Sequence, residues 1–476
     1  MSSSTPRISL ATSVAIVVGS IIGSGLFIRP ASMAQQLSSP SLLLLIWVLA
    51  GLMSLLGALL FAELGAMMPK TGGLFVHFNH LFGGPTAFLY GWSAFSIINT
   101  ASVAAIAFVC ASYIGQFVPL PECPSDLVQR FALPLPGLGT LYPLKDIGIK
   151  AVAIFLVMGF SYINAKSLKA GGRFQQVSAI INFSIIALLS IGLLSAKTGS
   201  IANLSTAYSF TDSISLLSGI VAAFTGAFFA YDGWINIVSM AGEIREPQKN
   251  IPRSLWWGVA ICMGIYILIN FSYFYVLPVN VMATSDLVAA DAMRLAQGES
   301  FALLAGGMIV CCTIGAINAN VMATARVTYA MGRDRVLSSW FGRLEEKSGT
   351  PKNALMLHGT WTSLLIFSGS FDLLADMYVF ITWLVYLLGA IGLFYWRTKE
   401  PLRERPYRVK GHPYLTLLFI LFSAAYLVAT VYKDISLYLE NKQPVINSLL
   451  ALLIVVAGVP LYFFSSKHRS SADKID

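Results

Sequence analysis

Charged residues and cysteines are both scarce in this sequence. Only 11% of the 476 residues are charged while 56% are hydrophobic, whereas about 25% of the residues of an ordinary soluble domain are charged. This composition excludes a chain built from soluble domains. The 5 cysteines show no CxxC spacing and the 5 histidines share no spacing, so the sequence predicts no disulfide framework, metal site or cofactor.

Long hydrophobic runs, in contrast, recur along the whole chain. A helix that spans a bilayer needs about 20 mostly apolar residues, and we predict twelve such spans. They cover residues 9–36, 41–68, 84–118, 146–164, 174–195, 215–240, 254–277, 301–331, 354–371, 374–396, 412–432 and 444–465. Each run is continuous, which favours helices over the alternating segments of about 10 residues in a β-barrel. The fold predicted is an all-α membrane protein with one transmembrane domain, residues 9–476, after a short tail, residues 1–8.

Basic residues are distributed unevenly between the two sides of the predicted membrane. The net charge is +9, yet only 8 of the 31 lysines and arginines fall on the side away from the N-terminus. These are Arg29, Arg130, Lys145, Lys150, Lys197, Arg294, Lys433 and Lys442. Because cytoplasmic loops carry an excess of Lys and Arg, both termini are predicted to be cytoplasmic, in the plasma or inner membrane. The basic charge therefore requires no nucleic acid partner.

Two spans are interrupted at corresponding positions. Glycines and serines from Gly19 to Gly25 interrupt the first span, and the segment from Gly226 to Gly233 interrupts the sixth. Both interruptions lie about 22 Å along their helices, near the centre of a tilted span. Five spans followed by five inverted ones is the pattern of many secondary transporters. It predicts a first repeat at about 9–195, a second at about 215–396, and two extra helices at about 412–465.

An interrupted helix at membrane depth implies a cavity or a ligand, since its free backbone groups must be satisfied there. One half-helix presents N–H groups with the positive end of its dipole, and the other presents carbonyls with the negative end. A zwitterionic amino acid would fit both. Taken alone, Gly19 and Gly23 also match the GxxxG pattern of a helix-packing face, but packing does not explain the second interruption.

Four motifs stand out along the chain. They are Gly19-Ser20-Ile21-Ile22-Gly23-Ser24-Gly25-Leu26-Phe27, Glu63-Leu64-Gly65 with Pro69-Lys70-Thr71-Gly72-Gly73, Phe229-Ala230-Tyr231-Asp232-Gly233-Trp234, and Gly242-Glu243 with Glu246-Pro247-Gln248-Lys249-Asn250-Ile251-Pro252-Arg253. With these motifs the sequence resembles the amino acid, polyamine and organocation transporter superfamily, and within it the light-chain-like L-amino acid exchangers and their bacterial relatives for serine and threonine. The resemblance covers about the first ten helices. It implies a fold of the leucine-transporter type, with broken helices 1 and 6 and alternating access.

The resemblance also implies a substrate site at the two breaks. Its residues would be Ile21, Gly23, Ser24, Gly25, Phe229, Ala230, Tyr231 and Asp232. The amides of Ser24 and Gly25 would bind the substrate carboxylate. The carbonyls that would bind its ammonium belong to Ile21, Phe229, Ala230 and Asp232. The Phe229 ring would be the outer gate, with ordinary core packing as the alternative.

Three hypotheses exist for Asp232, the one carboxylate placed near the membrane midplane. In the first, Asp232 caps the second half of helix six, because Asp is a preferred N-cap residue. In the second, it faces the substrate side chain and selects cationic amino acids. In the third, it is a proton carrier whose pKa is raised by desolvation.

Helix five departs from the pattern of many relatives. They carry a lysine that reaches toward the first helix, and Asn182 stands at that position here. This leaves uncoupled exchange, another protonatable group, or a bound cation near Thr313.

Cys123 lies in an outer loop that can carry a disulfide to a heavy-chain glycoprotein in light-chain-type transporters, but a free thiol is the expectation.

The function predicted is an exchanger of free, neutral L-amino acids. The alternatives are a cationic amino acid transporter, a proton- or sodium-coupled symporter, and a membrane receptor that binds amino acids without transporting them. An enzyme is not expected, since the sequence contains no GxSxG, GxxxxGK[ST] or HExxH motif.

Overall fold

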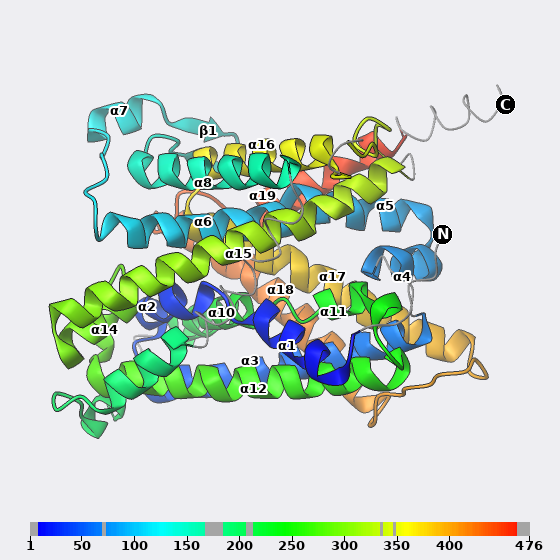
Figure 1. Ribbon diagram of the computed structural model, residues 1–476, viewed down its shortest axis with the longest axis horizontal. Helices are drawn as coiled ribbons and strands as arrows, with labels where there is room; N and C mark the ends of the chain where they lie inside the picture. The colour runs from blue at the N-terminus through cyan, green and yellow to red at the C-terminus, as the bar shows by residue number, and fades with distance from the viewer. Residues whose placement is uncertain are drawn as a thin grey trace. The chain divides into compact units, whose positions relative to one another are not determined.

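The computed structural model describes residues 8–68, 73–166, 184–205, 213–333, 337–345 and 349–463, and these are almost entirely helical (Figure 1). The helices of the first half are α1 (Leu10–Ile21), α2 (Gly25–Leu37), α3 (Pro40–Met67), α4 (Gly73–Phe82), α5 (Gly84–Ser93), the π-helical turn η1 (Ala94–Ile98), α6 (Asn99–Gly115), α7 (Ser125–Arg130), α8 (Ile147–Lys166), a helix over Ser184–Leu194 and the 3₁₀ turn η2 (Ile201–Leu204).

The second half continues in the same way. Its helices are α10 (Ser213–Tyr231), α11 (Asn236–Ser239), the 3₁₀ turn η3 (Ala241–Glu243), α12 (Pro247–Val276), α13 (Val279–Ala283), α14 (Val288–Gln297), α15 (Glu299–Arg333), α16 (Lys352–Ser368), α17 (Phe371–Lys399), α18 (Tyr414–Leu439) and α19 (Asn447–Val456). The strands β1 (Leu133–Leu135) and β2 (Gly139–Leu141) form a small antiparallel hairpin in which Leu133 pairs with Leu141.

Within these described residues, seven helices are long and apolar enough to cross a membrane, or eight if the bent pair α1 and α2 is one span. They coincide with spans predicted from the sequence, and shorter apolar helices occupy other predicted spans. The multi-pass, all-helical architecture is therefore confirmed. The helix α4, the hairpin and the short helices α7, α13 and α14 were not predicted, because each is too short or too polar to give a span-length apolar run.

The chain folds into two compact units whose segments alternate along the sequence. The first unit comprises Met1–Ala87, Ile186–Glu299 and Thr382–Thr430, and the second comprises Phe88–Ile185, Ser300–Ile381 and Val431–Asp476. In the second unit α8 and α16 pack against each other and both pack against α6. The single domain and its two repeats stay a prediction.

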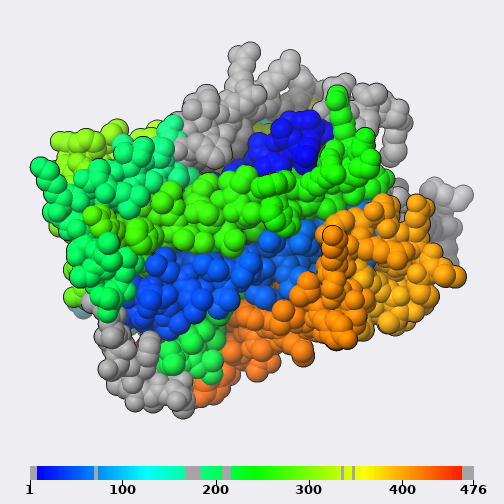
Figure 2. Space-filling view, turned by 90° about the horizontal axis from the view of Figure 1, so that it is seen from below, coloured from blue at the N-terminus to red at the C-terminus, as the bar shows by residue number. Residues whose placement is uncertain are grey.

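The first unit contains both predicted breaks. In it α12 packs along α3 and α1, and α10 packs against α2 and α3; Figure 2 shows α12 in green and α3 in blue side by side, with the segment that contains α18 in orange beside them. Glycines on α3 allow this close approach, since a Cβ at Gly51 would lie 2.9 Å from the Met263 side chain and one at Gly57 would lie 2.9 Å from Phe419.

Candidate functional site

The first predicted break is present in the structure. Helix α1 ends at Ile21 and α2 begins at Gly25, and the two axes differ by 44°. The break is shorter than the predicted interruption from Gly19 to Gly25. Gly19 remains helical because a glycine inside a helix costs only about 1 kcal/mol relative to alanine, which cooperative helix formation tolerates.

The second break follows Tyr231, where α10 ends, and helical structure resumes at Asn236. Gly233 lies between them with a φ of 109°, a conformation that side chains with a Cβ rarely adopt. A Cβ at Gly233 would also lie 2.3 Å from the carbonyl oxygen of Ser20. This glycine therefore permits both the turn and the close approach of the second break to the first.

The two breaks contact each other at a second point. A Cβ at Gly25, the first residue of α2, would lie 3.0 Å from the α-carbon of Ala230 and 3.0 Å from Phe229 Cδ1. The structure thus brings the eight predicted site residues onto two adjacent segments. Six of them are buried (Ile21, Ser24, Gly25, Phe229, Ala230 and Tyr231), and Gly23 and Asp232 are half-buried.

A tyrosine that the sequence did not single out joins the two breaks. The Tyr266 hydroxyl, on α12, lies 2.8 Å from the Ile21 carbonyl and 2.8 Å from the Ala230 carbonyl. These carbonyls belong to the last turns of α1 and α10, where helical hydrogen bonding ends and the negative ends of the helix dipoles lie. Two negative helix ends therefore meet at one point. Nothing in the sequence distinguishes Tyr266 from a core tyrosine on an apolar helix.

The groups around this point have the charge pattern of a zwitterion site. The carbonyl ends of α1 and α10 attract a cation, while α2 begins beside them at Gly25 and presents its first N–H groups with the positive end of its dipole. An ammonium group and a carboxylate carried on one small molecule would be complementary to this arrangement. No ionised side chain is required for either contact.

The predicted gate residue Phe229 carries an arginine on its ring. The Arg29 guanidinium carbon lies 5.0 Å from the centre of the Phe229 ring, close enough for a cation–π attraction. Arg29 is only 3% exposed, although the sequence analysis counted it among the basic residues of the outer side, where most charged side chains would be expected to reach water. The difference arises because α2 packs against α10, which encloses the arginine.

Asp232 lies in a small hollow next to the second break. The Tyr386 hydroxyl on α17 donates a 2.5 Å hydrogen bond to Asp232 Oδ1. The hollow is lined by Ser54, Phe228, Asp232, Trp234, Trp383, Tyr386 and Phe419. The N-cap residue of α11 is Ile235, which provides no side-chain capping bond. Asp232 is thus hydrogen-bonded to α17.

Comparison with known proteins decides the family. A model of the amino acid permease family matches residues 8–460. This chain belongs to the amino acid permease family. It is therefore a membrane transporter of the superfamily that the sequence motifs resembled, and not an enzyme.

Curated proteins similar to this permease include three transporters, matched over nearly all of its length. The b(0,+)-type amino acid transporter 1 of Mus musculus is 27% identical over 467 residues, covering 96% of this chain and 87% of that protein. Large neutral amino acids transporter small subunit 2 of Homo sapiens is 27% identical and covers 96% and 80%. The cystine/glutamate transporter of Pongo abelii is 28% identical and covers 96% and 84%.

Two residues, Asn182 and Thr313, were predicted to govern coupling. Asn182 falls outside the described residues, as does the motif segment Pro69 to Gly72. Thr313, on α15, is buried and donates its hydroxyl within its own helix, toward the carbonyls of Ile309 (2.8 Å) and Val310 (3.0 Å). A bridge between helices at these positions stays a prediction.

Within the part of the chain that the structure describes, no group of three or more His, Cys, Asp or Glu residues could hold a metal ion. Cys123 is half-buried and is a free thiol in the structure.

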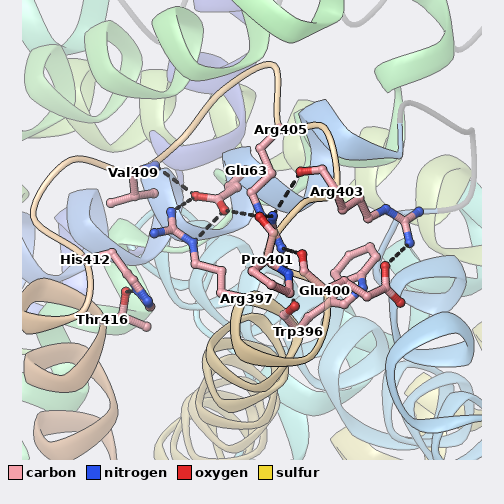
Figure 3. A network of polar contacts seen from close by, with 10 residues as sticks. All are labelled: Glu63, Trp396, Arg397, Glu400, Pro401, Arg403, Arg405, Val409, His412 and Thr416. Carbon is pink, nitrogen blue, oxygen red and sulfur yellow. Dashed lines mark hydrogen bonds and ion pairs between the residues drawn. The ribbon is translucent and has the colours of Figure 1, made fainter.

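This permease also contains a buried charged cluster, centred on Glu63 of α3 (Figure 3). Arg397 of α17 pairs with both carboxylate oxygens of Glu63, with Nε 2.8 Å from Oε1. The Val409 N–H donates to Oε2 at 2.8 Å, and Arg405 Nε lies 3.6 Å from Oε1. Glu63 is 0% exposed. The cluster thus fixes the connection between α17 and α18 to α3.

Proposed function

We propose that this permease exchanges free L-amino acids across the cell membrane by alternating access, with neutral amino acids as its main substrates. The observation that carries the proposal is the meeting of the two breaks, at which the carbonyls of Ile21 and Ala230 lie 2.8 Å from one hydroxyl oxygen beside the start of α2. The family and the printed names of its relatives support amino acids as the substrate class.

In this proposal the backbone recognises the groups that all amino acids share. The substrate ammonium lies against the carbonyl ends of α1 and α10, and its carboxylate lies against the amides of Ser24 and Gly25. The Phe229 ring closes over the substrate as the outer gate, and its contact with Arg29 supports a defined closed position. Backbone recognition leaves the side chain free to vary, which suits a transporter with several substrates.

Asp232 favours neutral substrates in our proposal. One of its carboxylate oxygens already accepts a hydrogen bond of 2.5 Å from the Tyr386 hydroxyl, and such a charge-assisted bond stabilises a half-buried carboxylate without a cationic ligand. A cationic substrate is the second candidate, because aromatic rings around a carboxylate also attract an ammonium or guanidinium group. The hollow with Trp234 and Trp383 is the observation that favours it.

The transmembrane arrangement completes the proposal. We propose twelve spans in a leucine-transporter-type fold, supported by the breaks at corresponding places in the first and sixth spans. Both termini would be cytoplasmic, and no heavy-chain glycoprotein would be required. The orientation is tested with single cysteines placed in either terminus and an impermeant maleimide added to intact cells. The predicted orientation is wrong if either terminus reacts from outside.

Uptake into proteoliposomes tests the function. Radiolabelled serine, alanine, leucine, lysine and arginine are supplied outside vesicles that contain either buffer or unlabelled amino acid, at two pH values and with or without sodium. We expect uptake of the neutral amino acids only when the vesicles contain amino acid. If uptake occurs into buffer-filled vesicles and requires a proton or sodium gradient, the protein is a symporter and not an exchanger. Binding without uptake would establish a receptor, and neither binding nor uptake would contradict the amino acid assignment.

A further inference from the structure

The hydroxyl of Tyr266 makes an unusual pair of contacts. It lies 2.8 Å from one carbonyl of each break, Ile21 on α1 and Ala230 on α10. A phenol carries a single proton, so it donates to only one carbonyl at a time, whereas each carbonyl has two lone pairs. The two carbonyls therefore compete for the phenolic proton, and an additional N–H donor at this place would be favoured.

The position of the hydroxyl is fixed by packing. Tyr266 is fully buried, and its ring lies 5.5 Å from that of Trp47 and 4.9 Å from that of Tyr231, measured between centres. Trp47 and Tyr231 also contact each other at 5.8 Å. Three rings from α3, α10 and α12 thus support one another, and the hydroxyl reaches the breaks from the side on which α3 and α12 pack along each other.

Core packing explains the ring of Tyr266 but not the place of its hydroxyl. A buried tyrosine needs a hydrogen-bond partner, and one carbonyl of any neighbouring helix end would suffice. Here both partners are carbonyls at the ends of broken helices, and both are among the groups proposed to bind the substrate ammonium. Tyr266 therefore affects the distance between the two carbonyls on which that binding depends.

We propose that Tyr266 is a positioning residue for the substrate ammonium: its hydroxyl links the two breaks and holds the Ile21 and Ala230 carbonyls where both accept from one ligand. When the hydroxyl donates to one carbonyl, a lone pair of the other is open to an N–H of the ligand. This inference rests on the proposed function, because it takes an amino acid as the ligand.

The test compares Tyr266→Phe with wild type and with Tyr273→Phe. The second variant removes the hydroxyl of another fully buried tyrosine of α12, seven residues further along the helix. Exchange of alanine is measured in proteoliposomes over a range of concentrations. We expect Tyr266→Phe to raise KM roughly three- to tenfold, the effect of losing one hydrogen bond, while the maximal rate stays within about twofold. Tyr273→Phe should keep both values.

Hydrogen–deuterium exchange of the same three proteins without substrate provides a readout that does not depend on the ligand. We expect faster amide exchange in Tyr266→Phe at both breaks, around 22–25 and 232–236, and no such change in Tyr273→Phe. The proposed function is tested separately, by whether the wild-type protein transports alanine at all. The positioning role is tested by the differences between the variants.

A raised KM with a kept maximal rate and faster exchange at both breaks supports the positioning role. An unchanged KM overturns it, as does a fall in the maximal rate alone, since that is the result of losing folded protein. Faster exchange at one break only also overturns it, because the hydroxyl would then not link the two.

Discussion

Two buried polar regions of the first unit are built in opposite ways. The two breaks are joined by uncharged groups, the Tyr266 hydroxyl and two backbone carbonyls. Around Glu63, in contrast, the hydrogen bonds join a carboxylate to the Arg397 guanidinium and to the Val409 N–H. Hydrogen bonds with an ionised partner are roughly twice as strong as neutral ones.

This difference indicates which contacts can change during transport. In the proposed mechanism, substrate enters and leaves between the breaks, so the bonds there have to be exchanged for bonds to the substrate at little cost. The contact between α3 and the end of α17 has no such requirement, and a buried ion pair holds it in one arrangement. We therefore expect changes at Glu63 to affect stability and changes at the breaks to affect transport.

The largest effect is expected for Glu63→Gln. The substitution leaves the Arg397 guanidinium, with a side chain only 13% exposed, without its carboxylate, and removing one partner of a buried pair costs about 3–5 kcal/mol. The thermal unfolding midpoint of the purified protein should fall by many degrees. Glu400→Gln is the matched control, since its pair with Arg403 is partly exposed and such pairs contribute little. Equal midpoints for the two variants would contradict the comparison.

The next effect is expected for Gly233→Ala, and it should concern transport. The added Cβ meets the Ser20 carbonyl oxygen at 2.3 Å and forces an unfavourable φ of 109°, so the breaks must separate. Alanine exchange should fall below about a tenth of the wild-type rate, a loss equivalent to about 1.4 kcal/mol or more. Gly19→Ala, where a Cβ meets nothing within 4 Å, should retain exchange. Normal exchange by Gly233→Ala would refute the close approach of the breaks.

A smaller effect is expected for Arg29→Gln. Loss of the guanidinium above the Phe229 ring, 5.0 Å from its centre, removes an attraction of about 0.5–2 kcal/mol. The proposed gate should then close less completely, and KM for alanine should rise at least about twofold. Arg29→Lys keeps a cation and should recover part of the affinity. The double variant Phe229→Leu/Arg29→Gln tests whether the two residues act together. If its effect on KM, expressed as a free energy, equals the sum of the two separate effects, the residues do not act as a pair.

The smallest effect on neutral substrates is expected for Asp232→Asn, which removes the charge of a carboxylate at the second break. Asparagine can still accept the hydrogen bond from Tyr386, so alanine exchange should stay within about threefold of wild type, or about 0.7 kcal/mol. Uptake of lysine is measured alongside. Selective loss of lysine uptake would establish the cationic alternative, and an abolished pH dependence would identify a proton carrier.

Much of the architecture could be predicted from the sequence, because a bilayer imposes a simple rule on composition. Runs of about 20 apolar residues must be helices, and the span from 41 to 68 was therefore predicted almost to the residue of α3 (Pro40–Met67). The breaks were also predictable, since glycines disfavour a continuous helix. Gly23 and Gly25 lie within the first predicted span, and Gly233 lies within the sixth. Their exact limits depend on neighbouring helices and were not.

The sequence by itself determined the membrane location, the helical class, the two interrupted spans and, through its motifs, the permease family. Only the tertiary structure placed the Tyr266 hydroxyl between Ile21 and Ala230, paired Tyr386 with Asp232, and buried Arg29 and Glu63. The reason is physical. Hydropathy and glycine content act locally along the chain, whereas each of these contacts joins helices separated by many residues, and no local pattern records which helices become neighbours.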